Sequence, residues 1–127
     1  MERRALQCAV SVGCLVPILA GGFGMIEGVA WFSPSSPVDL DSHFRYLSGL
    51  LLAIGLGYAS TIPRIERHSA RVLLLTFLVL VGGVGRLFSL WSQGAPSAPM
   101  LAALAMELLV TPALALWQRR LARRLAE

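Results

Sequence analysis

Residues 70–91 read ARVLLLTFLVLVGGVGRLFSLW, and this stretch decides the fold class of the chain. It is apolar throughout except for a few polar side chains, and its only charges are Arg71 near the start and Arg86 inside the run. A helix of about 20 apolar residues is long enough to cross the hydrocarbon core of a bilayer. The stretch therefore predicts a membrane-spanning helix.

Similar apolar runs occupy most of the remaining chain, and proline-containing links separate them. Pro17 and Pro112 fall inside two of these runs, where we expect a kink or a local rearrangement of the helix. The sequence thus predicts an all-α integral membrane protein, a four-helix bundle forming one domain over residues 1–127. We expect its helices at about residues 5–32, 44–62, 70–91 and 99–117.

The composition excludes several classes of protein. Of the 127 residues 56% are hydrophobic and only 14% are charged, whereas soluble domains carry about 25% charged residues. So short a soluble chain could not cover its surface with so few charges, which argues against a cytosolic enzyme, a nucleic-acid module and a disordered tail. The net charge of +4 comes from arginines that flank the apolar runs, so we expect membrane lipids around the chain and no nucleic-acid partner.

The distribution of arginine predicts the orientation in the membrane. Positive charge collects on the cytoplasmic side of membrane proteins, and the links between runs alternate between arginine-rich and arginine-free. Both termini are therefore expected in the cytoplasm of a bacterial cell, with the chain crossing its inner membrane. The arginines that set this orientation are Arg3, Arg4, Arg64, Arg67, Arg71, Arg119, Arg120, Arg123 and Arg124.

Each expected span also contains one charged residue that needs an explanation. Charges within a span are costly and usually face a bundle interior or a watery cavity. From the helical rise of ~1.5 Å per residue, all four lie in the outer half of the membrane. Two hydrophilic neighbours extend this set, so the sequence predicts a polar pocket or buried charge network formed by Glu27, Asp41, Arg45, Arg86, Ser89 and Glu107.

Several functions fit a group of charges at this depth in the membrane. In the first, Arg45 and Arg86 hold the head group of an amphipathic lipid-like molecule, quinone or isoprenoid, and Glu27 and Glu107 orient the arginines. In the second, the charges and glycine faces dock the chain as an accessory subunit of a larger membrane complex. A third is an acid–base isomerase acting on an apolar substrate, and a purely structural network is the simplest alternative. The sequence predicts no catalytic set, metal site or cofactor.

Three segments also carry a resemblance to a known family. Residues 41–49 (DSHFRYLSG), residues 85–89 (GRLFS) and Glu107 are similar to motifs of a bacterial family of small four-helix membrane proteins. That family is catalogued as a domain of unknown function and loosely resembles DoxX-type proteins. The resemblance implies the four-helix topology and a recurring polar set at Arg45, Arg86 and Glu107, and it implies no activity.

Overall fold

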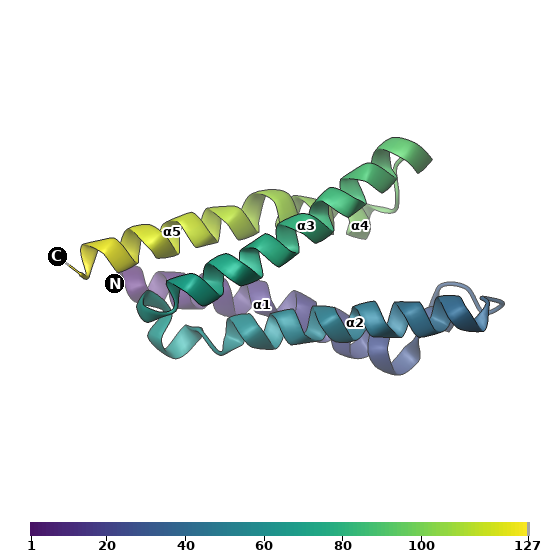
Figure 1. The fold of residues 1–127 in the computed structure, drawn as a ribbon, viewed down its shortest axis with the longest axis horizontal. Coiled ribbons are helices and arrows are strands. Elements are labelled where there is room, and N and C mark those ends of the chain that lie inside the picture. Colours follow the sequence, from purple (N-terminus) through teal and green to yellow (C-terminus); the bar gives the residue numbers. More distant parts are fainter. Residues whose placement is uncertain (127) are drawn as a thin grey trace. The chain divides into compact units, whose positions relative to one another are not determined.

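The computed structural model describes residues 1–126, where all regular structure is helical and no strand occurs. This confirms the all-α fold class. The third short element, η3, is a π-helical segment that joins α4 to α5 in one continuous rod (Figure 1). The elements are α1 (Glu2–Glu27), η1 (Val29–Trp31), α2 (Val38–Ala59), η2 (Ile62–Arg67), α3 (Ser69–Gln93), α4 (Ala98–Ala105), η3 (Met106–Val110) and α5 (Thr111–Arg124).

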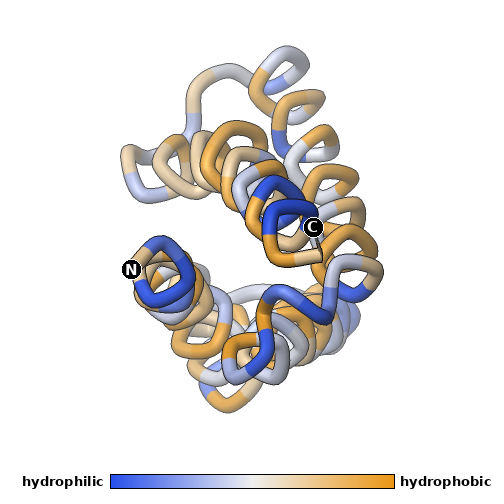
Figure 2. Tube along the Cα trace, turned by 90° about the vertical axis from the view of Figure 1, so that its left-hand side faces the viewer, coloured by the Kyte–Doolittle hydropathy of each residue, from blue (hydrophilic) through white to orange (hydrophobic). Residues whose placement is uncertain are grey.

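Three helical rods are long and apolar enough to cross a membrane: α1, α3 and the continuous rod Ala98–Arg124. The length and apolarity of these three rods indicate a membrane protein. The fourth expected span corresponds to α2, which does not reach the same apolarity because its first two turns contain Asp39, Asp41, His43 and Arg45. Figure 2 shows the resulting pattern along the chain, with long hydrophobic helices and hydrophilic residues near both chain ends.

The helix boundaries differ from the predicted ones for identifiable reasons. The first helix ends at Glu27 instead of residue 32, because Gly28 has a φ of 70° and leaves the helical conformation. The second begins at Val38, six residues before the apolar run, since acidic side chains in a first turn interact favourably with the helix dipole. The last continues to Arg124, where arginines in the final turn have the corresponding favourable effect.

Contacts between Cα atoms divide the chain into two compact units. Unit 2 comprises residues 7–63, in which α1 and α2 are antiparallel neighbours (Figure 1). Glycines let the two backbones approach closely: a Cβ on Gly21 would lie 2.7 Å from the Ser48 carbonyl oxygen, and one on Gly55 would lie 3.0 Å from the Ile18 nitrogen. Small residues at such crossings are typical of helices that pack within lipid.

Unit 1 comprises residues 1–6 and 64–127, of which residue 127 lies outside the described part. In this unit α3 packs against α5 and against η3. The buried amide of Gln118 on α5 donates from Nε2 to the Ile65 carbonyl (2.8 Å) and to the Ser69 hydroxyl (2.9 Å). These bonds fix the beginning of α3 to the end of α5. The expectation of one four-helix domain over residues 1–127 stays a prediction.

The arginine-rich segments of unit 1 meet at one end of it. Glu2 accepts hydrogen bonds from the Trp117 indole (3.2 Å) and from Arg124 (3.0 Å). Arg3 pairs with Glu66 at 3.1 Å. The first residues of the chain, the segment around η2 and the last turns of α5 therefore lie side by side.

Candidate functional site

The first charge cluster lies at the end of α1 and is centred on Arg45. The last carbonyls of a helix have no partner within that helix. Arg45, reaching from α2, donates from Nη1 to the carbonyls of Met25 (2.8 Å) and Ile26. Its Nη2 lies 3.4 Å from the carbonyl oxygen of Glu27. Arg45 therefore caps α1 with hydrogen bonds to three consecutive carbonyl groups.

Asp41 holds this guanidinium in place. Its Oδ2 accepts a hydrogen bond from Arg45 Nε at 2.7 Å, and its Oδ1 accepts one from the Val29 backbone N–H at 2.8 Å. Asp41 precedes the apolar run that begins at Phe44 and so lies outside the expected membrane-spanning segment. These two hydrogen bonds hold the pKa of the Asp41 carboxyl below its ordinary value, and the bond from Arg45 has the larger effect.

Gly28 is required where these groups meet. Its positive φ disfavours any other residue, and a Cβ there would collide with the Asp41 carboxylate and the Arg45 guanidinium. The carboxylate that orients Arg45 is that of Asp41, four residues earlier on the same helix, and not that of Glu27 as expected. The Glu27 side chain is exposed, because α1 ends at this residue and only its carbonyl faces Arg45.

The second charge cluster joins α3 to the rod Ala98–Arg124. Arg86 Nε donates to Glu107 Oε1 at 3.0 Å, and the two side chains are 39% and 18% exposed. Arg86 Nη1 also lies 3.2 Å from the sulfur of Met100. Glu107 Oε2 is buried, and no hydrogen-bond donor reaches it from residues 1–126. This pair therefore retains an unused acceptor, whereas the hydrogen-bonding groups of Arg45 are largely occupied.

Glu107 lies on a widened helical turn. Pro112 has no N–H to offer the carbonyl four residues earlier, and the preceding residues Met106–Val110 form a π-helix. The Met106 carbonyl accepts two hydrogen bonds from Thr111, one from its backbone N–H and one from its hydroxyl at 2.9 Å. The rearrangement expected at Pro112 is thus a π turn, a feature that often accompanies functional sites.

Small residues on α3 determine what surrounds this pair. Gly83 lets α3 approach η3, since a Cβ there would lie 3.1 Å from Glu107 Cβ. Gly82 and Gly85 have no such neighbour: nothing lies within 4 Å of the Cβ position of either. Ser89, three residues beyond Arg86, is exposed on the same face of the helix. The surface around Arg86 is therefore lined by small and hydroxyl-bearing residues.

The predicted site residues thus divide between the two units. Asp41 and Arg45 form one ion pair in unit 2, and Arg86 and Glu107 form the other in unit 1. Sequence reasoning did not identify Met100, since nothing in its surroundings in the sequence indicates a contact with an arginine. No group of three His, Cys, Asp or Glu side chains in residues 1–126 is arranged to hold a metal ion.

A match to a family model covers most of the chain. A family model described as a domain of unknown function (DUF4345) matches residues 5–118. The chain belongs to this family. The DUF4345 match includes both ion pairs, the Gly28 break and the π turn, so it spans the whole candidate site. No curated protein and no solved structure matches the chain.

Proposed function

We propose that the chain is a four-span bacterial inner-membrane protein whose Arg86–Glu107 pair binds the polar head group of an amphipathic lipid-like molecule, a quinone or an isoprenoid. α2 would supply the fourth span through its apolar run at residues 44–62. The engagement of Arg45 by Asp41 and by carbonyl groups supports this, since it lowers the cost of placing the charge at the membrane boundary.

The proposed orientation has both termini in the cytoplasm. Two contacts support it: Arg124 bonds to Glu2, and Arg3 pairs with Glu66. These contacts bring the arginine-bearing ends of the chain and the link around η2 to the same end of unit 1. A shared end is what the positive-inside rule requires of segments on one side of the membrane.

The observation that carries the binding proposal is the incomplete bonding of one pair. Glu107 Oε2 is buried without a donor from residues 1–126, as is Gln118 Oε1, and such an acceptor is costly because it has lost its hydrogen bonds to water. A hydroxyl of a bound molecule would satisfy this oxygen, while its carbonyl or anionic oxygen would accept from the remaining N–H groups of Arg86. In this proposal Arg86 binds the head group and Glu107 both orients Arg86 and accepts from the ligand.

Native mass spectrometry of the protein extracted gently from its own membrane tests the proposal. We expect a discrete additional mass of a few hundred daltons that is lost in Arg86→Gln and in Glu107→Gln. Arg45→Gln is the matched control, because it removes an arginine of similar exposure whose hydrogen bonds are internal. It is expected to lower stability and retain the ligand. An additional mass that persists in both Arg86→Gln and Glu107→Gln refutes the proposal.

A double-mutant cycle separates binding from a purely structural pair. An unpaired charge within a membrane costs on the order of 3 kcal/mol, so either single substitution at Arg86 or Glu107 should destabilise the protein. Replacing both should recover most of that loss in either interpretation. Under the binding proposal the stable double variant still lacks the ligand. If the wild type carries no ligand but shows the same coupling free energy between Arg86 and Glu107, the pair has a structural role only.

The second candidate function is an accessory subunit of a larger membrane complex. The observation in its favour is the open face of α3 at Gly82 and Gly85, since small residues permit close contact with another helix in lipid. A partner that co-purifies at fixed stoichiometry and is lost when both glycines are replaced by leucine supports it. A monomer in mild detergent contradicts it.

A further inference from the structure

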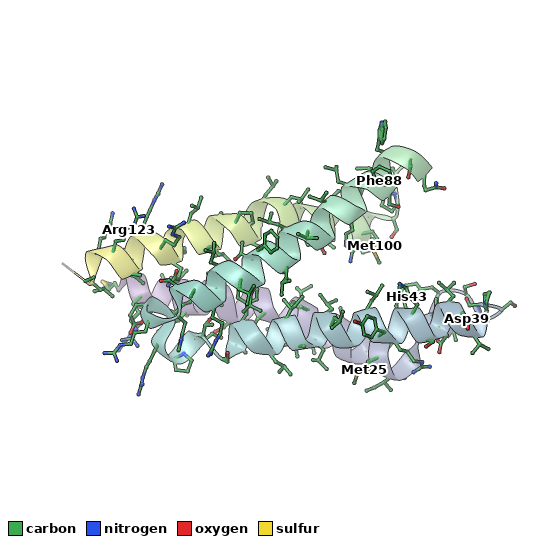
Figure 3. The ribbon with its side chains drawn as sticks, viewed as in Figure 1. Met25, Asp39, His43, Phe88, Met100 and Arg123 are labelled. Atoms are coloured by element: carbon green, nitrogen blue, oxygen red, sulfur yellow. The ribbon has the colours of Figure 1, made fainter. Side chains whose placement is uncertain are left out.

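The last turns of α5 carry a basic pocket that the proposed function does not use. It is a shallow, solvent-open hollow of about 150 Å³ on the surface of α5, lined by Leu116 and the exposed side chains of Arg119, Arg120 and Arg123. The three arginines lie three, four and seven residues after Leu116, which places all four side chains on one face of the helix. Figure 3 shows Arg123 near the C-terminal end of α5, well along the helix from Met100.

The arginines of this pocket lack the counter-charges that Arg3 and Arg124 have at the same end of unit 1. Arg124 bonds to Glu2 and Arg3 pairs with Glu66. Within residues 1–126 no ion pair or hydrogen bond engages the side chains of Arg119, Arg120 or Arg123. Three guanidinium groups around one cavity repel one another, and an anion from outside would relieve that repulsion.

The position of the pocket on α5 indicates what kind of anion it would take. Leu116 is 57% exposed and lies near the end of the apolar part of the helix, and the three arginines follow it within two turns. An apolar side chain beside a cationic rim matches the boundary between acyl chains and head groups. Arginine also pairs with phosphate oxygens through two parallel hydrogen bonds.

We propose that the pocket formed by Leu116, Arg119, Arg120 and Arg123 binds the phosphate group of an anionic phospholipid. The guanidinium groups hold the phosphate oxygens, and the Leu116 side chain contacts the first part of an acyl chain. Clusters of arginine directly beyond a spanning helix attract anionic lipids in this way. The pocket lies roughly 20 Å along the helix from Glu107, so it forms a site separate from the Arg86–Glu107 pair, and each can fail on its own.

Titration of the purified chain with phosphatidylglycerol, followed by native mass spectrometry, tests the site. The variant Arg119→Gln/Arg123→Gln should bind this lipid about thirtyfold more weakly, as expected for the loss of two cations near a membrane surface. The matched control is Arg4→Gln/Arg64→Gln, which removes the same charge from two exposed positions of unit 1 outside the pocket. It should bind phosphatidylglycerol as the wild type does.

Further arms distinguish the remaining explanations. Arg119→Lys/Arg123→Lys keeps the charge needed for insertion and should weaken binding only severalfold, since lysine cannot form the paired bonds. Equal loss in the control variant would mean that binding follows total charge. Phosphatidylcholine has the same phosphate group but no net charge, so equal binding of this lipid would mean that the site does not select anionic lipids. Displacement of the lipid by about 1 mM inorganic phosphate, a concentration too low to screen charges appreciably, would identify a site for a free anion. Each of these three results overturns the proposal.

Discussion

Replacing Gly21 by alanine tests the close packing of α1 against α2, and the adjacent Gly22 provides the control. A Cβ on Gly21 would lie 2.5 Å from the Leu52 nitrogen and 2.7 Å from the Ser48 carbonyl oxygen. Both are backbone atoms that cannot rotate away, so the helices would have to separate by about 1 Å to restore ordinary contact distances. Nothing lies within 4 Å of a Cβ on Gly22.

The free energies of unfolding of the two variants should differ clearly. Both substitutions raise helix propensity, by up to about 1 kcal/mol relative to glycine, and this gain cancels in the comparison. Overpacking costs typically 1–3 kcal/mol, so Gly21→Ala should be less stable than Gly22→Ala by about that amount. Unfolding in mixed micelles, followed by circular dichroism as the fraction of denaturing detergent increases, measures the difference. Variants equal in unfolding free energy within about 0.5 kcal/mol would refute the close contact between α1 and α2 at Gly21.

Two further predictions concern single hydrogen-bonding groups. Because the pKa of Asp41 is lowered in the fold, its contribution to stability is present above the unfolded-state pKa of about 4 and is lost as the pH falls through the folded value. A plot of unfolding free energy against pH should therefore fall less steeply below about pH 4 in Asp41→Asn than in the wild type, and identical slopes would contradict the Asp41–Arg45 bond. Gln118→Leu removes the donor to the Ile65 carbonyl and should lower the unfolding free energy by about 1–3 kcal/mol in the same detergent assay. The control Gln93→Leu, at an exposed position, should change it by less than about 0.5 kcal/mol. Equal effects of the two substitutions would show that the Gln118 hydrogen bonds contribute nothing to stability.

The sequence was sufficient for the helical fold because hydrophobic runs report directly on the environment of a helix. The apolar run at residues 70–91 became α3 with a change of only one or two residues at its ends. The sequence was less informative about α2, because its apolar run covers only the part of the helix that follows the polar first turns. The polar first turns continue the same helix because acidic residues there favour it.

The candidate site was predictable to different extents in its two halves. One acidic or basic residue on each expected span predicted a network of opposite charges, and the structure contains one such pair between two helices, Arg86–Glu107. The partner of Arg45 depended on where α1 ends, and this is set by the positive φ of Gly28. Hydropathy carries no information about that angle, so the apolar run predicts a helix that continues to residue 32. The spacing of Asp41 and Arg45, four residues apart on one helix, was the signal that could have identified their pair.

The cap on α1 restricts the length of the link between α1 and α2. A polar surface link ordinarily tolerates insertions and deletions, and residues 32–37 have the composition of such a link. Arg45, however, must reach three particular carbonyl groups, and Asp41 must reach the N–H of Val29. Adding or removing a residue in the link would shift both side chains away from their partners at once. Relatives that retain this cap should therefore vary the residues of the link freely while keeping their number constant.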